Sequence, residues 1–66
     1  MKQITLNGQN LQDDSDTIGQ LLDKHALSQG RFAVEIDGQL LPKSRLNTTP
    51  LTDGMSIEVV QAVGGG

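Results

Sequence analysis

The sequence predicts a small α+β domain in which one helix packs on one face of a mixed β-sheet. Three observations support this fold class. The chain has 66 residues, which is enough for a single domain. Apolar and polar residues alternate near both ends of the chain and in its middle, which is the period of half-buried strands. The segment that begins at Thr17 instead spaces its apolar residues as an amphipathic helix does.

The N-terminal segment is predicted to form a β-hairpin. Ile4 and Leu6 point to one face of the first strand, and the residues between them point to the other. Asn7-Gly8 follows, a dipeptide favoured in two-residue hairpin turns because both positions need a positive φ. Residues 9–12 then form the return strand, with Leu11 facing the core.

A helix is predicted to begin at Thr17. Thr17 and Gln20 fit a capping box, in which each side chain accepts a hydrogen bond from the other residue's backbone N–H. The apolar stripe is formed by Ile18, Leu21 and Leu22. Gly30 is expected to end the helix, because glycine readily adopts the left-handed conformation found after helix ends.

The second half of the chain is predicted to form another hairpin and a last strand. Residues 32–36 alternate again, and Asp37-Gly38 supplies the hairpin turn. A short strand around Leu40 follows and ends at Pro42. A single helical turn is expected near 44–46, a tight turn at 53–54, and the final strand over 55–63.

The final strand carries apolar residues on both faces. Ile57 and Val59 share one face with Met55, whereas Val60 and Ala62 fall on the other. One helix covers only one face of a sheet, so the second face should be polar. Apolar residues there predict a contact surface.

Composition argues against several classes of function. The formal net charge is −3, the five cations are scattered, and the one aromatic residue is Phe32, which disfavours nucleic-acid binding. The absence of cysteine excludes disulfides and cysteine-ligated zinc. No apolar run is long enough for a membrane span, and no signal peptide is expected, so the cytoplasm is the simplest compartment.

The polar side chains do not form a recognisable catalytic or metal site. His25 is the only histidine, and no triad pattern accompanies it, so we interpret it as an ordinary helix residue. Asp13, Asp14 and Asp16 lack the spacing of a calcium-binding loop and are interpreted as solvated acids near a helix start. We therefore expect no catalytic residue and no bound metal.

The remaining feature is the run of glycines after the last strand, in "VQAVGGG". Glycine adds nothing to a core and loses much backbone entropy on ordering. The run is therefore either a frayed end or a device that presents a terminal carboxylate.

Taken together, these features resemble the ubiquitin-like β-grasp sulfur carriers, and most closely the ThiS family of thiamine thiazole synthesis. The resemblance covers the whole chain through "TIGQLL", "VEIDGQLLPK", "LTDGMSIEVV" and "AVGGG". It implies a mixed sheet whose first and last strands are parallel and central. It also implies a β-grasp domain over residues 1–63 and a flexible glycine tail over 64–66. This chain departs from the family in ending on three glycines rather than two.

The resemblance implies a carrier and not an enzyme, with no permanently bound cofactor. A ubiquitin-activating-type adenylyltransferase would use ATP and magnesium to adenylate the carboxylate of Gly66. Sulfur from a sulfur-delivery protein would then produce a thiocarboxylate, the sulfur donor to thiazole synthase. The residues expected to contact partners are Val60, Ala62, Val63, Gly64 and Gly65.

Three alternatives stay open at this point. The small subunit of molybdopterin synthase is a sulfur carrier of the same fold, although its tail usually contains a proline before Gly-Gly. A ubiquitin-like protein modifier would instead join its tail to lysines. A plain interaction module would use the face that carries Val60 and not the tail.

Overall fold

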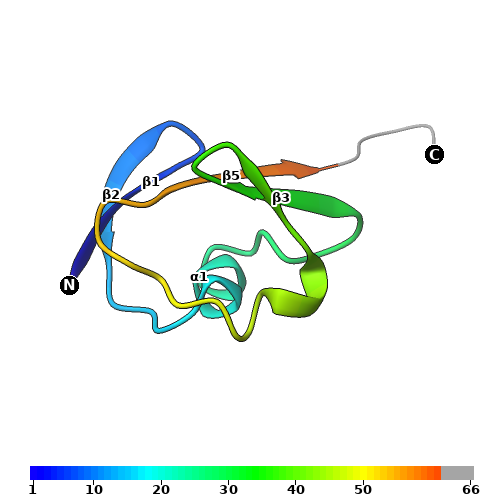
Figure 1. Ribbon diagram of the computed structural model, residues 1–66, viewed down its shortest axis with the longest axis horizontal. Helices are drawn as coiled ribbons and strands as arrows, with labels where there is room; N and C mark the ends of the chain where they lie inside the picture. Colours follow the sequence, from blue (N-terminus) through cyan, green and yellow to red (C-terminus); the bar gives the residue numbers. More distant parts are fainter. Residues whose placement is uncertain (62–66) are drawn as a thin grey trace.

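A computed structural model describes residues 1–61 of the chain. Within this range the chain forms five β-strands, one α-helix and one short 3-10 helix (Figure 1). In chain order the elements are β1 (Lys2–Leu6), β2 (Gln9–Asp13), α1 (Ile18–Lys24), β3 (Phe32–Ile36), β4 (Gln39–Leu41), η1 (Lys43–Arg45) and β5 (Ser56–Gln61). No helix within residues 1–61 combines the length and hydrophobicity needed to cross a membrane.

The strands form a single mixed sheet in the order β2-β1-β5-β3-β4. The two hairpins, β1–β2 and β3–β4, are antiparallel, and β5 lies between them, parallel to β1 and antiparallel to β3. Helix α1 packs across one face of this sheet (Figure 1). The predicted α+β class, the order of the elements and the parallel pairing of the first and last strands are all confirmed. The arrangement is the ubiquitin-like β-grasp.

The core lies between the sheet and α1. Its buried members come from three strands, from the helix and from the connection between η1 and β5: Ile4, Leu6, Ile18, Leu21, Leu22, Val34, Leu46, Leu51 and Ile57. The predicted helix stripe and the predicted inward faces of the strands are therefore confirmed. Full burial of one such side chain contributes roughly 1.5–3 kcal/mol, so this cluster is the main source of stability in so small a domain.

The start of α1 differs in one detail from the predicted capping box. The Thr17 side chain accepts a hydrogen bond from the Gln20 backbone N–H at 3.2 Å, as predicted. The Gln20 side chain, however, accepts from the backbone N–H of Asp16 and not from that of Thr17. Two further N–H groups of the first turn, those of Ile18 and Gly19, donate to carbonyls of the η1–β5 connection. The helix is thus capped partly by a distant segment.

The predicted end of the helix at Gly30 is wrong. Helix α1 ends at Lys24, and Ala26 adopts the left-handed conformation with a φ of 58°. The N–H of Leu27 donates to the carbonyl of Leu22 at 2.8 Å, which is the long bond of a Schellman motif. Leu27 also packs against the core, and this long-range contact ends the helix early. Gly30, with a φ of 71°, lies in the loop before β3.

The turns follow the sequence prediction closely. Both residues of each hairpin turn, 7–8 and 37–38, have positive φ, as a type I′ turn requires. Gly54 also has a positive φ, and the predicted helical turn near 44–46 is η1. Strand β2 extends one residue further than predicted, to Asp13, and β5 begins at Ser56 rather than at residue 55. The predicted continuation of β5 to residue 63 and the predicted boundary before residue 64 lie outside the described residues.

Candidate functional site

Strand β5 leads to the C-terminal glycines and is the natural centre of a candidate site. It pairs with β3 from Ile57 opposite Ile36 to Gln61 opposite Phe32, which is all of its described length except Ser56. Its pairing with β1 is much shorter and ends at Ile57 opposite Leu6. Within residues 1–61, the second half of β5 therefore pairs on one side only and extends past the first hairpin.

Two turn side chains anchor β5 from opposite sides. The Asn7 side chain, in the first hairpin turn, accepts a hydrogen bond from the Val59 N–H at 2.8 Å. The Asp37 carboxylate, in the second hairpin turn, accepts from the Ser56 N–H at 3.0 Å. Sequence reasoning identified both turns but missed these bonds. The signal was present, because asparagine and aspartate at turn positions commonly hydrogen-bond to nearby backbone.

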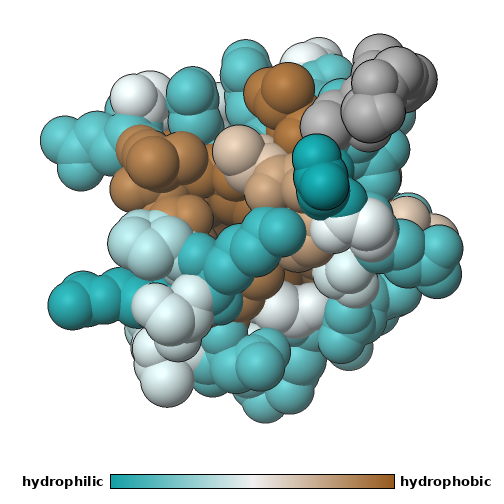
Figure 2. Space-filling view, turned by 90° about the vertical axis from the view of Figure 1, so that its right-hand side faces the viewer, coloured by the Kyte–Doolittle hydropathy of each residue, from teal (hydrophilic) through white to brown (hydrophobic). Residues whose placement is uncertain are grey.

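The sheet face opposite α1 carries exposed apolar side chains next to the end of β5. We call this surface the open face; the register places on it Ala33, Glu35, Leu40, Glu58 and Val60. Leu40 is 69% exposed and Val60 is 59% exposed. Figure 2 views the end of the molecule where β5 finishes, and hydrophobic side chains gather in its upper half within a hydrophilic border.

The exposure predicted for Val60 is confirmed, and its role in binding a partner stays a prediction. Val60 lies directly opposite Ala33 on the neighbouring strand. The other residues predicted to take part in the site, Ala62, Val63, Gly64, Gly65 and Gly66, lie outside the described residues. The structure therefore brings Val60 together with three open-face residues that sequence reasoning did not select: Ala33, Glu35 and Glu58.

A row of three side chains crosses the open face beside Val60. Leu40 of β4 lies opposite Glu35 of β3, which in turn lies opposite Glu58 of β5. The two glutamates thus occupy directly opposed positions on adjacent strands. Within residues 1–61, all ion pairs involve Lys24 or His25 with Asp13 or Asp14, so neither glutamate is paired with a cation.

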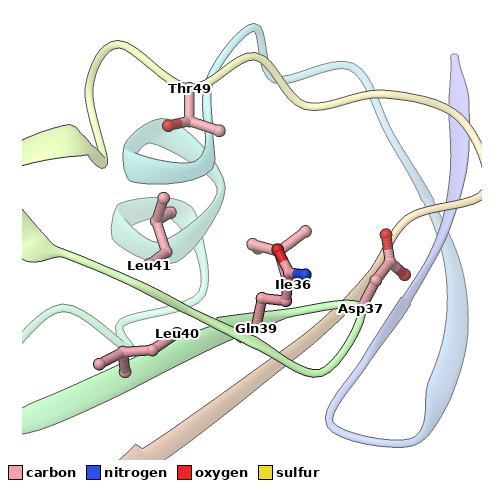
Figure 3. A pocket seen from close by; sticks show the side chains of 6 residues that line it. All are labelled: Ile36, Asp37, Gln39, Leu40, Leu41 and Thr49. Atoms are coloured by element: carbon pink, nitrogen blue, oxygen red, sulfur yellow. The ribbon is translucent and has the colours of Figure 1, made fainter.

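A shallow hollow of about 340 Å³ lies at the β3–β4 hairpin, on the side of the sheet that faces α1. Figure 3 shows it between the β3–β4 hairpin and the segment that carries Thr49. Its wall is formed by Ile36, Asp37, Gln39, Leu40, Leu41 and Thr49. The one charged group in this wall is the Asp37 carboxylate, which already accepts the Ser56 N–H. The lining thus offers apolar contact to a neighbour and no constellation for acid–base chemistry.

His25 and Lys24, at the end of α1, form a separate cluster with Asp13 and Asp14. His25 Nε2 lies 3.5 Å from the carboxylate of Asp13, and Lys24 Nζ lies 3.3 Å from Asp13 and 3.0 Å from Asp14. Burial raises the pKa of Asp13, but hydrogen bonds from Ser15 and Lys24 outweigh it and lower that pKa to about 2. Asp13 is therefore a buried structural anion and not a solvated acid as predicted. Across residues 1–61, no group of three or more acidic or histidine side chains is placed to hold a metal ion.

Comparison with known proteins agrees with this architecture. The model of the ThiS family matches residues 2–66. The crystal structure of the thiamine biosynthesis protein ThiS from Geobacter metallireducens is similar, with a TM-score of 0.80 and 26% sequence identity over 97% of this chain and 99% of that chain. An NMR solution structure of a thiamine biosynthesis protein from the same organism has a TM-score of 0.71 and 27% identity over 97% of this chain and 87% of that chain. No curated protein sequence matches this chain significantly.

Proposed function

Because the chain belongs to the ThiS family, we propose that it is a sulfur carrier of thiamine biosynthesis and that the carboxylate of Gly66 carries the sulfur. The observation that carries this proposal is the family match, which runs through the terminal glycines. The two solved structures described above are thiamine biosynthesis proteins, which favours the thiazole route over the molybdopterin route.

Conversion of the Gly66 carboxylate to a thiocarboxylate requires that the unreactive carboxylate is first activated. An oxygen of the Gly66 carboxylate attacks the α-phosphorus of ATP, pyrophosphate leaves, and an acyl-adenylate forms. Sulfide (HS⁻) released by the sulfur-delivery protein then attacks the acyl carbon, and AMP leaves. The resulting thiocarboxylate retains one oxygen and gains one sulfur, which thiazole synthase takes up. ATP and magnesium belong to the adenylating partner. The cytoplasm, where ATP is available, is the compartment that we propose for the reaction.

Two parts of this chain have different roles: the open face docks on the partner, and the terminal glycines bring the Gly66 carboxylate to the partner's site. The open face, with Val60 exposed on β5, offers a partner an apolar surface on the strand that leads to the reacting carbon. Gly64 and Gly65 carry no Cβ, so a backbone of this composition passes through a narrow channel to the nucleotide. Three extended residues span about 10 Å, enough to enter a partner's site while the domain stays on its surface.

Amidation of Gly66 tests the proposal. The native and amidated proteins are incubated with the ubiquitin-activating-type adenylyltransferase from the same organism, ATP, magnesium and a sulfide source, and intact mass is measured. We expect replacement of one oxygen by sulfur in the native protein and no change in the amidated one, because an amide cannot be adenylated. Equal sulfur gain in both proteins would place the sulfur elsewhere and overturn the proposal.

Gly65→Val is a second test of the same site. A β-branched side chain stiffens the backbone and adds bulk next to the reacting carbon, so we expect strongly reduced sulfur loading. The readout is again intact mass, with the circular dichroism spectrum as a check on folding. Isopeptide-linked products in cell extract, instead of free thiocarboxylate, would identify a protein modifier.

A further inference from the structure

The open face contains an electrostatic arrangement that the fold alone does not explain. Glu35 and Glu58 are directly opposite each other on antiparallel strands, where Cβ atoms lie about 5 Å apart. Like charges in such a position destabilise a sheet. An uncharged or oppositely charged pair at these positions would suit the fold better.

The cations of the chain do not relieve this repulsion within residues 1–61. Lys2 donates to the Ser15 carbonyl, Lys24 pairs with Asp13 and Asp14, and Lys43 lies 4.2 Å from the centre of the Phe32 ring. Residues 62–66 carry no charged side chain. Within the described part of the chain, Arg31 and Arg45 form no ion pair with either glutamate. A cation that pairs with both carboxylates would therefore come from another molecule.

The surroundings of the pair indicate which cation fits. Leu40 extends the row on the β4 side, and Val60 with Ala33 forms the next row toward the end of β5. Two carboxylates on a partly apolar surface suit a guanidinium, because its planar fork donates to two acceptors at once and is more weakly hydrated than an ammonium. Its apolar stem can lie on Leu40 and Val60.

We infer that the open face binds a partner surface on which an arginine side chain sits between Glu35 and Glu58 while apolar neighbours cover Val60 and Leu40. This inference rests on the proposed function, since the partner is the adenylating enzyme. The glutamate repulsion tolerated in the free carrier is relieved on docking. The pair therefore favours the complex over the free protein and directs the domain so that the end of β5 faces the partner's site.

The test uses Glu35→Gln, Glu58→Gln and the double variant in the full chain. Asp16→Asn is the matched control for each single variant, because it also removes one negative charge, ahead of α1 on the helix side of the molecule. Thermal stability, dissociation constant for the adenylating enzyme at low and high NaCl, and thiocarboxylate formation are measured for each protein. Phenylglyoxal, which modifies arginine, then probes the enzyme alone and in complex.

We expect the double variant to be at least as thermally stable as the native protein and to bind about tenfold more weakly at low salt, with less salt dependence. Asp16→Asn should bind as the native protein does. The native carrier should protect one arginine of the enzyme from phenylglyoxal, and the double variant should not.

Four results would overturn the inference. Unchanged affinity of the double variant, with normal thiocarboxylate formation, would reject the glutamate pair and leave the proposed function standing. Weaker binding together with lower thermal stability would assign the glutamates a structural role. Protection of no arginine would reject the partner chemistry. A native protein that is neither bound nor loaded with sulfur would reject both proposals.

Discussion

Asp13 and Gly19 are single residues whose environments run against their general preferences. Asp13 is a carboxylate that is only 4% exposed, and it is held by hydrogen bonds from Ser15 and Lys24. Gly19 lies inside a helix, where glycine is costly, yet it is buried against the segment that follows η1. Each is tolerated because of contacts made with another part of the chain.

Asp13 should make the stability of the domain depend on pH in the acid range. Its pKa is about 2 in the folded protein and higher in the unfolded chain, so its contribution is complete above about pH 4 and is lost as pH falls through 2. We expect Asp13→Asn to cost about 2 kcal/mol at neutral pH and to flatten the decline of stability with acid. Urea unfolding from pH 7 to pH 2 measures both effects.

Asp14→Asn is the control for this prediction. Asp14 is exposed, and its pKa is lowered mainly by its hydrogen bond with Lys24. Because water screens this pair, the variant should change stability only slightly at every pH. Equal losses for the Asp13 and Asp14 variants would contradict a special role for the buried carboxylate.

Gly19→Ala should destabilise the protein although alanine is the better helix former. A Cβ at this position would overlap the Asn47 side chain and come within 3.3 Å of the Leu46 backbone carbon. The Gly19 N–H donates to the Leu46 carbonyl at 2.8 Å, so a shift of this segment also weakens the helix cap. We expect a net loss of about 1 kcal/mol in thermal unfolding.

A double-variant cycle with Asn47→Ala separates two effects of Gly19→Ala on stability: steric overlap with Asn47 and the higher helix propensity of alanine. In an Asn47→Ala background the largest overlap disappears, so Gly19→Ala should cost less there or become stabilising. An equal cost in both backgrounds would mean that Asn47 is not the obstacle.

At the scale of elements, β5 depends on the two hairpin turns that flank it. Asn7 and Asp37 both adopt positive φ and both accept a β5 N–H through their side chains. Asn7 and Asp37 thus each adopt the turn conformation and also hold β5 in place. The bond from Asn7 reaches Val59, immediately before the exposed Val60, so it orders the part of β5 that pairs with β3 alone.

Asn7→Gly isolates this bond, since glycine retains the positive φ and loses the acceptor. We expect a loss of about 1 kcal/mol in stability and faster hydrogen exchange at the Val59 amide. Asn7→Asp keeps both the turn preference and an acceptor, and it should behave as the native protein does. Unchanged exchange at Val59 in Asn7→Gly would refute the anchoring role.

At the scale of the whole molecule, the residues that stabilise the fold and the residues proposed to bind a partner lie on opposite faces of the sheet. The face against α1 carries the buried core, and the open face carries exposed apolar and acidic side chains. Substitutions on the open face should therefore alter binding with little effect on folding.

Val60→Asp is the most direct test of this separation between binding and folding. It places a third carboxylate beside Glu58 on a surface that becomes desolvated on docking, so we expect at least tenfold weaker binding to the adenylating enzyme. Stability should change little, because Val60 is 59% exposed. Val60→Thr is the uncharged control of similar shape. Titration calorimetry and thermal unfolding measure the two properties, and normal affinity of Val60→Asp would contradict docking through this face.

Local patterns in the sequence were sufficient to predict most of the architecture. Alternation predicted the strands, the stripe of Ile18, Leu21 and Leu22 predicted the buried helix face, and two Asx-Gly dipeptides predicted the hairpin turns. Each of these features depends on neighbours a few residues away. The glycine run and the family resemblance indicated the carrier role, which the family match supports.

The tertiary structure decided whatever depends on residues distant in the chain. The helix ends at Lys24 and not near Gly30 because Leu27 packs into a core assembled from other elements. Asp13 is an anion held in place because Ser15 and Lys24 converge on it. Glu35 and Glu58 are 23 positions apart, and only the β3–β5 register places them opposite each other. Sequence periodicity determines which face a side chain occupies, whereas strand register determines which side chains on that face are neighbours.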